Sequence, residues 1–367
     1  MTSQSKIIFV GNARSYHTLD LCRSLHKHLP KKSWVFFTDC IESEGHIRII
    51  DDQDAVQKLL LIDPLLFRDQ STKANLWRNL LKLLLAPLQA VLLKIRVGNP
   101  KEKVIHAHTF YYGMLCRMAK LPFFFTPQGG ELTERPKESD FYRFLMQWTL
   151  SGAKYTFVDS RRMLNMAQEL GCKNVSIHQY GIDTASCLAA DIGLKRWRVI
   201  SNRGIEKNYQ IDLIQTARDR ECDDVSLTFF YPLWDSLYRS AFQEKLRPND
   251  QDLGRIEKIK CYQLYAESIL VISIPRSDSS PRSVYEAIFC GVPVATVSSP
   301  WVDDLPFSMR KRVLLVDPQS PGWFRQAYIW AQQCVNDPFV PCSTAISKFD
   351  QFAVAYDIVH GFYFSDK

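Results

Sequence analysis

Runs dominated by apolar residues alternate with polar loops along the whole chain, and this pattern predicts an α/β protein. Four of the runs have the length of buried strands: Lys6–Val10, Trp34–Thr38, Ile269–Ile274 and Val313–Asp317. Leu19–Leu29 has apolar residues three and four positions apart instead, which is the spacing of an amphipathic helix. Because strands and helices alternate, we expect parallel sheets with helices packed against them.

The same patterns assign the remaining elements. Leu121–Leu132 is predicted to be a buried strand that ends in Gln128-Gly129-Gly130-Glu131. Gly171 is the expected C-cap of a helix at Arg161–Leu170. We predict further strands at His46–Ile50, Lys103–His108 and Leu227–Tyr231, and helices at Arg161–Leu170, Trp323–Cys334 and Thr344–Phe364.

The stretch Ile269–Val297 organises the rest of the chain. Its first strand leads into a polar loop, Pro275–Pro281, and a helix begins near Arg282. A second apolar strand follows the turn Gly291-Val292-Pro293. This order is typical of a parallel sheet, whose loops at the carboxyl ends of the strands are where ligands bind.

The polar loop and the first helical turn carry hydroxyl groups and two acids. Hydroxyls and backbone amides at a helix N-terminus suit an anion such as phosphate. Asp278 and Glu286 are eight residues apart, so one lies on the loop and the other on the helix. Two carboxylates facing one ligand suit a sugar, because carboxylates accept paired hydrogen bonds from neighbouring hydroxyls. The alternative is structural: Ser280 or Ser283 caps the helix and Glu286 is a solvated surface residue.

Composition and charge restrict the class of protein. The chain has 367 residues, 46% apolar and 23% charged, which suits two folded domains. Residues 1–185 contain 25 Lys and Arg against 17 Asp and Glu, whereas the remainder is nearly balanced. A basic half fits nucleic acid, an anionic membrane or an anionic substrate. The chain shows no nucleic-acid motif, so we expect no nucleic-acid partner.

Cysteine usage and the start of the chain indicate the compartment. The ten cysteines include no C-x-x-C pair, so the sequence suggests neither a disulfide framework nor a zinc site. The first residues pass from a short polar tail into a strand without the pattern of a signal peptide. We therefore expect a cytoplasmic protein.

A basic and apolar segment, Lys73–Arg96, stands apart from the rest of the chain. No acid occurs between Asp69 and Glu102, and Pro87 interrupts the run. Arg78 and Lys82 make the segment a poor membrane-spanning helix. We consider two roles equally: an amphipathic surface for an anionic lipid leaflet with Trp77 at the interface, or a helix packed on its own domain.

These motifs resemble one known family. The pattern of an acid, seven residues, Glu-Ala and then Cys-Gly-Val-Pro-Val is similar to the signature of the retaining GT-B glycosyltransferases of family four. Val104–Glu131 and Tyr155–Asp183 also resemble segments of that family. The resemblance implies the α/β GT-B fold, with two Rossmann-like domains facing a central cleft. We expect an acceptor domain at 1–187, a nucleotide-sugar domain at 188–345, and a C-terminal helix at 346–367 that crosses back to the first domain.

The resemblance also implies roles for the residues of the second domain. Asp278 would position the donor sugar, Glu286 would hold the ribose, and Arg203 and Lys207 would meet the diphosphate charge. No D-x-D motif ends a strand, so we expect no catalytic metal. With retention of configuration, the leaving phosphate itself can take the acceptor proton. The remaining residues expected at the donor are Ser279, Ser280, Pro281, Arg282, Ser283, Tyr209 and Gly181.

Residues expected on the acceptor side follow the strands of the first domain. Relatives often have His where this chain has Gln128, and Gln cannot act as a base at neutral pH. His106 and His108 end one strand, but no further metal ligands stand near them, so we expect no metal site there. The acceptor-side residues are Gly11, Asn12, His108, Gln128, Gly129, Gly130 and Glu131.

The resemblance predicts a retaining, metal-independent glycosyltransferase that uses no cofactor. It would move a sugar from a nucleoside diphosphate, with UDP the expected nucleotide, to a glycan or lipid-linked acceptor. The expected setting is synthesis of a surface polysaccharide, capsule or lipopolysaccharide, in the cytoplasm or peripherally on the inner leaflet of the plasma membrane. Two alternatives stay open: a nucleotide-sugar epimerase of the same architecture, and a catalytically silent GT-B partner of a polysaccharide assembly complex.

Overall fold

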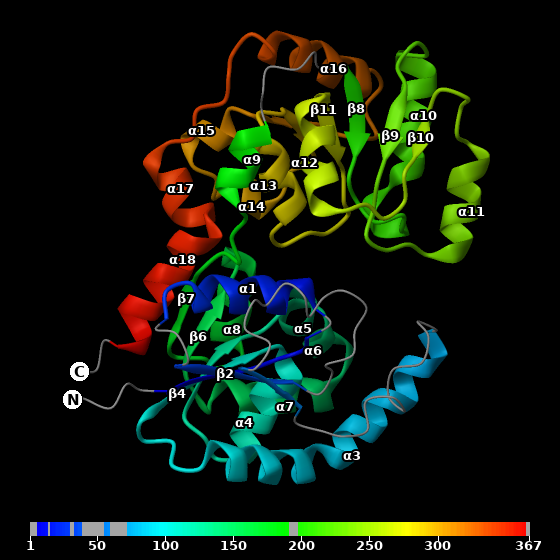
Figure 1. The fold of residues 1–367 in the computed structure, drawn as a ribbon. Helices are drawn as coiled ribbons and strands as arrows, with labels where there is room; N and C mark the ends of the chain where they lie inside the picture. Colours follow the sequence, from blue (N-terminus) through cyan, green and yellow to red (C-terminus); the bar gives the residue numbers. More distant parts are fainter. Residues whose placement is uncertain are drawn as a thin grey trace. The chain divides into compact units, whose positions relative to one another are not determined.

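The computed structural model describes residues 6–13, 15–29, 33–38, 55–58, 72–190 and 197–364, and all of their side chains except those of residues 16, 58 and 72–79. The chain forms two compact units (Figure 1). Unit 1 contains Met1–Tyr180 and Gln351–Lys367, and unit 2 contains Gly181–Asp350. The boundaries expected from the sequence were 187/188 and 345/346.

Unit 1 is built on a parallel sheet of seven strands in its described residues, in the order β3-β2-β1-β4-β5-β6-β7. The strand order changes direction between β1 and β4, so the loops after these two strands diverge to opposite sides. The strands are β1 (Lys6–Val10), β2 (Trp34–Thr38), β3 (Val56–Lys58), β4 (Lys103–His108), β5 (Phe123–Thr126), β6 (Ala153–Val158) and β7 (Val175–Ile177).

Helices cover both faces of this sheet. Ile8 and Val10 of β1 pack into one hydrophobic cluster and Ile7 and Phe9 into another, because successive strand residues point to opposite faces. The first cluster includes α3 (Thr72–Val97), α4 (Phe110–Met118), α7 (Asp140–Leu150) and α8 (Arg161–Glu169). The second includes α1 (Tyr16–His26), α18 (Gln351–Ile358) and η4 (Val359–Tyr363). The short helices α5 (Gly129–Thr133) and α6 (Arg135–Glu138) follow β5.

Unit 2 contains a second parallel sheet, with six strands in its described part, in the order β10-β9-β8-β11-β12-β13. Here the order changes direction between β8 and β11. In open α/β sheets a ligand binds in the crevice outside the carboxyl ends of such a pair of strands. The strands are β8 (Arg198–Ser201), β9 (Leu227–Phe229), β10 (Gln251–Asp252), β11 (Ser268–Ser273), β12 (Val294–Thr296) and β13 (Val313–Leu315).

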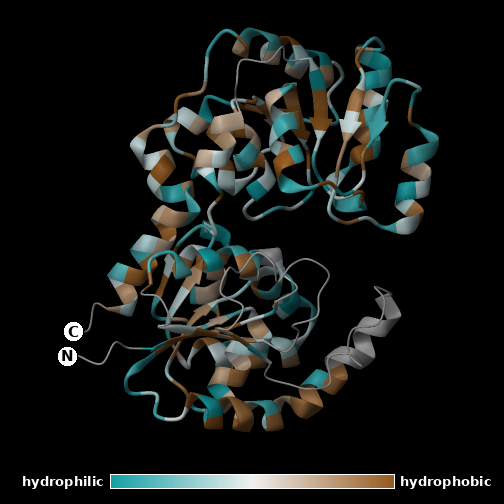
Figure 2. Ribbon diagram, viewed as in Figure 1, coloured by the Kyte–Doolittle hydropathy of each residue, from teal (hydrophilic) through white to brown (hydrophobic). Residues whose placement is uncertain are grey.

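The helices of unit 2 also lie on both faces of its sheet, and the apolar strands run between them (Figure 2). Val271 of β11 belongs to the cluster of α12 and α13, whereas Leu270 and Ile272 belong to the cluster of α10 and α16. The helices are α9 (Thr184–Ala190), η3 (Lys207–Tyr209), α10 (Ile211–Glu221), α11 (Ser236–Glu244), α12 (Lys258–Ala266), α13 (Arg282–Phe289), α14 (Pro300–Asp303), α15 (Phe307–Arg310), α16 (Trp323–Cys334) and α17 (Ser343–Phe349).

Most predicted elements are confirmed, but two are wrong in part. The strand predicted within Leu121–Leu132 ends at Thr126 as β5, and the helix α5 begins at Gly129. The predicted helix Thr344–Phe364 is interrupted at Asp350, whose backbone is extended (φ −71°, ψ 123°) and forms a bridge with Ile182. Asp350 also accepts a hydrogen bond from the Thr184 hydroxyl at 2.6 Å. These tertiary contacts divide the segment into α17, α18 and η4. The predicted strand His46–Ile50 lies outside the described residues.

Candidate functional site

The loops after β8 and β11 are joined to each other at the carboxyl edge of the unit 2 sheet. The Asn208 side chain donates to the Ser277 carbonyl at 3.1 Å and accepts from the Ser277 N–H at 3.2 Å. Gln210 donates its side-chain amide to the Ile274 carbonyl at 2.7 Å, from a left-handed backbone conformation (φ 52°). These bonds hold the two loops in one place, and the sequence pattern predicts a role for neither Asn208 nor Gln210.

Arg203 is the centre of a polar cluster between these loops. Its guanidinium forms an ion pair with Asp278 and donates to the Ser283 hydroxyl at 2.9 Å. It also lies over the Tyr209 ring, 4.5 Å from the centroid. The Arg203 and Asp278 side chains are only 9% and 15% exposed, so the pair is shielded from bulk water. Four residues predicted at the donor are therefore brought together.

Gly204 allows this cluster to pack closely. A Cβ atom at this position would lie 2.6 Å from Cδ1 of Leu233 and 3.0 Å from the Tyr209 ring. Any larger residue would therefore displace the ring on which Arg203 rests. The loop after β8 needs a glycine at this position for space and not for backbone conformation. Gly204 does not have the positive φ that several other glycines of the chain have.

The start of α13 differs from an ordinary capped helix. Its N-cap is Pro281, and no side chain caps the helix, so the structural alternative with Ser280 or Ser283 as the cap is wrong. The Ser283 hydroxyl contacts Arg203 instead, and the Ser283 carbonyl accepts from the Asn202 side chain at 3.0 Å. The Arg282 N–H donates to the Ser280 carbonyl at 3.1 Å, so it is already used within the loop.

Glu286 is buried in the body of α13 rather than solvated. Its side chain is 5% exposed and forms an ion pair with Lys258, which is 52% exposed at the start of α12. Tyr262 and Tyr265 on α12 are buried beside this acid, and burial, followed by the Glu286 charge, raises the pKa of both phenols. Lys258 was not predicted from the sequence, because no local pattern identifies it as the partner of Glu286.

Two residues predicted at the donor do not join the Arg203 cluster. Lys207 is exposed in η3, and its side chain has no hydrogen bond or ion pair within the described part of the chain. Gly181 has φ 70° at the first position of unit 2. Within the described residues, the side-chain partners of Arg203 are Asp278, Ser283 and Tyr209, and Gly181 is not among them.

The residues expected on the acceptor side lie at the carboxyl edge of the unit 1 sheet. Gly11 packs so closely on Thr18 that a Cβ atom would lie 2.6 Å from its methyl group. The Thr18 hydroxyl is in turn 2.7 Å from Nδ1 of His108. Gln128 donates to the Ser15 hydroxyl at 3.1 Å. These contacts connect the ends of β1, β4 and β5, while Asn12 follows Gly11 in the same loop.

Glu131 holds the loop after β5 in place. Its carboxylate accepts the N–H groups of Gln128 at 3.0 Å and Phe110 at 2.8 Å, and Gln128 and Glu131 form a capping box at the start of α5. Burial raises the pKa of Glu131, and these two N–H bonds oppose the rise. Gly129 and Gly130 are the first residues of α5, and Gly130 has open space where a Cβ would stand.

His106 has a structural role. Both ring nitrogens are within hydrogen-bond reach of hydroxyls, one of Tyr363 and the other of Thr126 at 2.7 Å. Complete burial lowers the pKa of His106 to about 3 and lowers that of His108 well below its usual range. No cluster of three or more His, Cys, Asp or Glu able to hold a metal occurs in the described residues.

Comparison with known proteins shows the fold. No family model and no curated protein matches the chain. HepE of Anabaena in complex with UDP has a TM-score of 0.70 at 14% identity, over 98% of this chain and 99% of that one. Sucrose-phosphate synthase of Thermosynechococcus elongatus gives the same TM-score and identity, over 98% of both chains. A Listeria monocytogenes structure provisionally identified as a UDP-N-acetylglucosamine 2-epimerase has a TM-score of 0.62 at 13% identity, over 100% of this chain and 98% of that one. The predicted GT-B fold is confirmed.

Proposed function

We propose that this chain is a glycosyltransferase that takes its sugar from a nucleoside diphosphate, with UDP as the nucleotide. The observation that carries the proposal is the Arg203, Asp278, Ser283 and Tyr209 cluster at the carboxyl ends of β8 and β11. This is the place where open α/β sheets bind ligands. A GT-B structure with UDP bound, that of HepE, supports the choice of nucleotide.

Each group of the cluster has a role in this proposal. The nucleoside diphosphate gains negative charge as the glycosidic bond breaks, and Arg203 would stabilise that charge from a shielded position. Lys207 and Arg282 would add positive charge from the loops on either side. Asp278 would accept hydrogen bonds from the sugar hydroxyls, and Glu286 would accept them from the ribose.

The reaction proposed is transfer with retention of the anomeric configuration and without a metal. The Arg203 cluster would supply the charge that a metal supplies in other transferases. The leaving phosphate would accept the acceptor proton on the same face of the sugar. In unit 1, Gln128 caps a helix and hydrogen-bonds to Ser15, so it has no part in proton transfer.

The acceptor proposed is a glycan or a lipid-linked sugar in the synthesis of a surface polysaccharide, capsule or lipopolysaccharide. The groups at the ends of β1, β4 and β5 would contact it, from Gly11 and Asn12 to His108 and the loop Gln128–Glu131. The enzyme would act in the cytoplasm, at the inner leaflet of the plasma membrane when its acceptor is lipid-linked.

Thermal unfolding in the presence of nucleotides tests the proposal. We expect UDP or one UDP-sugar to stabilise the purified chain by about 2.7 kcal/mol at a concentration a hundredfold above its dissociation constant, with EDTA present. Glu286→Ala should lose this response, whereas Glu267→Gln, which removes an acid paired with Arg198 elsewhere in unit 2, should keep it. If no nucleoside diphosphate or nucleotide sugar stabilises the chain, the donor site is not functional and the silent-partner alternative holds.

An epimerase is the second candidate, because the Listeria structure has the same fold. Incubation of the chain with the stabilising nucleotide sugar separates the two activities. An epimerase converts the sugar without an acceptor, whereas a transferase releases the nucleoside diphosphate and glycosylates an added acceptor extract.

A further inference from the structure

The outer surface of one helical layer of unit 1 is apolar and basic. α3 packs on α4 and α4 packs on α7, so the three helices form one layer on the sheet. α3 buries one side in this layer through Ala86, Gln89, Ala90 and Leu93. Its opposite side exposes large apolar residues at three- and four-residue spacing: Leu80, Leu84, Leu88, Val91 and Ile95. Figure 2 shows this apolar character along α3.

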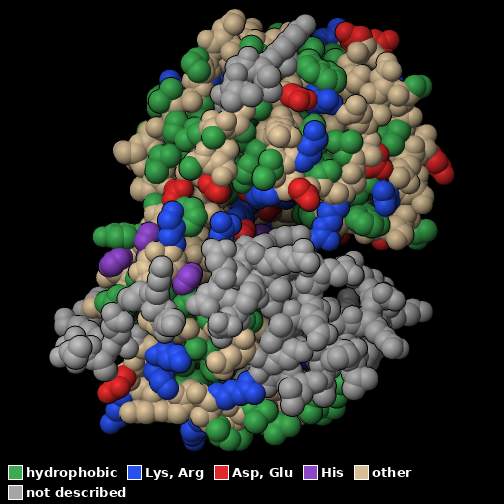
Figure 3. Space-filling model, in the orientation of Figure 1, with side chains coloured by type: hydrophobic (Ala, Val, Ile, Leu, Met, Phe, Trp, Pro, Cys, Tyr) green, Lys and Arg blue, Asp and Glu red, His purple; other side chains and the backbone are tan. Residues whose placement is uncertain are grey.

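α7, in the same helical layer, also exposes large apolar residues. Phe141 and Phe144 lie one turn apart on α7 and are 61% and 60% exposed. Hydrophobic side chains gather along the lower edge of unit 1 in Figure 3, with Lys and Arg side chains among them. Scattered apolar residues are normal on a protein surface, but a continuous stripe on a long helix marks an interaction site.

The charge around the stripe selects the partner. Lys94 and Arg96 are exposed in the last turns of α3, Arg143 is exposed beside the phenylalanines of α7, and α3 contains no acid. Two exposed acids lie near this position: Glu138, the last residue of α6, and Asp140, the first residue of α7. A second copy of this chain would bring basic residues against basic residues. An anionic lipid surface would neutralise them instead, while its acyl region receives the apolar side chains.

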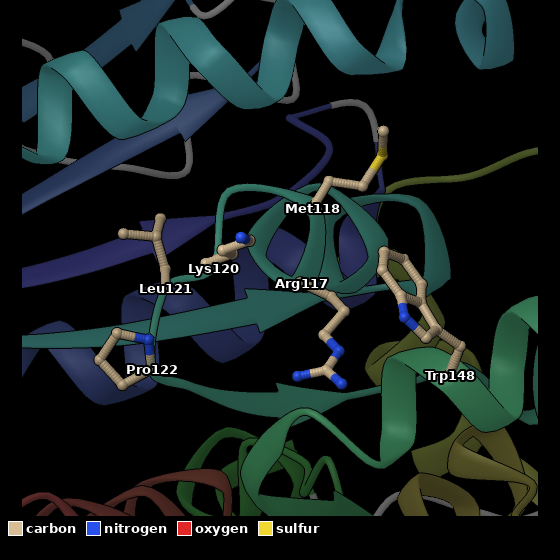
Figure 4. A pocket seen from close by; sticks show the side chains of 6 residues that line it. All are labelled: Arg117, Met118, Lys120, Leu121, Pro122 and Trp148. Carbon is tan, nitrogen blue, oxygen red and sulfur yellow. The ribbon is translucent and has the colours of Figure 1, made fainter.

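A cavity of about 570 Å³ lies at the end of the same layer, lined by Arg117 and Met118 of α4, Trp148 of α7 and the loop Lys120–Pro122 (Figure 4). Arg117 lies 5.5 Å from the Trp148 ring centroid, and its Nε is buried with no hydrogen-bond partner among the described residues. Gly152 makes room for it, because a Cβ there would be 2.2 Å from Cδ of Arg117. Two cations beside an apolar wall suit the phosphate of a lipid headgroup.

We propose that the outer surface of α3 and α7 docks on an anionic phospholipid bilayer and that the Arg117, Lys120 and Trp148 cavity receives a lipid headgroup. α3 would lie in the plane of the interface with its apolar stripe toward the acyl chains. None of the described helices is long and apolar enough to cross a membrane. On this proposal the helix would serve both roles that the sequence left open for Lys73–Arg96, because one of its sides packs on its domain and the other is exposed.

Vesicle sedimentation of the full chain tests the docking surface. We expect binding to vesicles of phosphatidylcholine with phosphatidylglycerol, weaker binding to phosphatidylcholine alone, and a loss of binding as salt is raised. Leu84→Ser with Ile95→Ser removes two residues that are 69% and 70% exposed and should weaken binding at least about thirtyfold. Leu237→Ser with Val340→Ser is the matched control, because these residues of unit 2 are 85% and 73% exposed, and it should bind like the wild type.

A second pair of variants tests the cavity. Arg117→Gln with Lys120→Gln should weaken binding to the anionic vesicles by about fivefold for each cation and leave binding to phosphatidylcholine alone nearly unchanged. Lys260→Gln with Lys348→Gln removes the same charge from exposed positions of unit 2 and is its control. If this control loses as much binding as the cavity variant, net charge explains the effect and the headgroup site is refuted.

Other outcomes overturn the proposal as a whole. The proposal is refuted if the wild-type chain does not bind anionic vesicles at low salt. It is also refuted if the Leu84→Ser, Ile95→Ser variant of α3 binds them as strongly as the wild type does. Sedimentation velocity gives a third test. If the wild type is a dimer that does not bind vesicles and the α3 variant is a monomer, this surface is an interface with a second copy of the chain. Circular dichroism of each variant checks that it is folded. Nucleotide binding is measured separately, so failure here leaves the transferase proposal standing.

Discussion

Asp278→Asn is expected to strengthen the binding of UDP while it weakens sugar transfer. In the structure Asp278 pairs with Arg203, the cation proposed to meet the diphosphate. Without the carboxylate charge, Arg203 keeps its full positive charge toward a phosphate, and one source of repulsion is removed. The Asn side chain keeps the shape of Asp, but only one of its two polar atoms can accept a hydrogen bond from a sugar hydroxyl.

The burial of the pair sets the size of the effect. Because the two side chains are 9% and 15% exposed, an effective dielectric constant near 20 is more suitable than that of water. A phosphate held by Arg203 would lie roughly 6 Å from the Asp278 carboxylate, which gives a repulsion of about 3 kcal/mol by Coulomb's law. Asp278 also orients Arg203, and its loss offsets part of this gain. We expect a net gain of about 1–2 kcal/mol, or five- to thirtyfold tighter binding.

Isothermal titration calorimetry with UDP measures this effect on the wild type and Asp278→Asn. Arg203→Lys should bind UDP more weakly than the wild type, because Lys cannot keep the bonds to both Asp278 and Ser283. Glu267→Gln, in the Arg198 pair, is the control and should change the dissociation constant less than about twofold. The reasoning is refuted if Asp278→Asn binds UDP more weakly than the wild type while the control is unchanged.

Three further predictions concern the fold and the site. Lys258→Met should lower the free energy of unfolding by about 1–3 kcal/mol because it leaves the buried Glu286 carboxylate unpaired, and Glu286→Gln added to it should recover most of this loss in urea unfolding. Burial lowers the pKa of His106 to about 3 in the folded chain, whereas in the unfolded chain this residue takes up a proton near pH 6.5. Below pH 6.5 the unfolded state therefore binds more protons than the folded state, and the stability that neutral His106 contributes is lost as pH falls. Urea unfolding should therefore show about 2 kcal/mol less stability at pH 5 than at pH 6.5 from this residue, and His106→Gln should remove that difference. Gly204→Ala should lower both the melting temperature and UDP affinity by moving the ring beside Arg203, whereas Gly130→Ala, which has open space, should leave both nearly unchanged.

Local features of the fold could be predicted from the sequence. β1, β2, β4 and α16 begin and end where the apolar runs do, and Gly171 has the positive φ (84°) of a helix C-cap. These features depend on spacing, on burial of one face and on the freedom of glycine, which are properties of neighbouring residues. The helix beginning at Arg282 was predictable for the same reason.

Features that depend on distant residues could not be predicted. Thr344–Phe364 has helical spacing throughout, and only the bridge between Asp350 and Ile182 explains its interruption. Lys258 is 28 residues from Glu286 in sequence, and nothing local distinguishes it from the other exposed lysines of the chain. α3 shows the same limit, since its sequence is equally suited to packing and to lipid until the structure shows which residues are exposed.

The first turn of α13 helps to orient Arg203, the buried cation among the groups proposed to meet the diphosphate. The sequence suggested that the amides of Ser279–Ser283 would form an anion site. The Arg282 N–H bonds to the Ser280 carbonyl, and the N–H groups of Val284 and Tyr285 bond to the Pro281 carbonyl. A helix N-terminus attracts anions through free N–H groups, so the Arg282 amide is not available, nor are those of Val284 and Tyr285 just after this stretch. The Ser283 hydroxyl lies 2.9 Å from Arg203 rather than capping the helix, so this turn also orients a cation that would bind the phosphate.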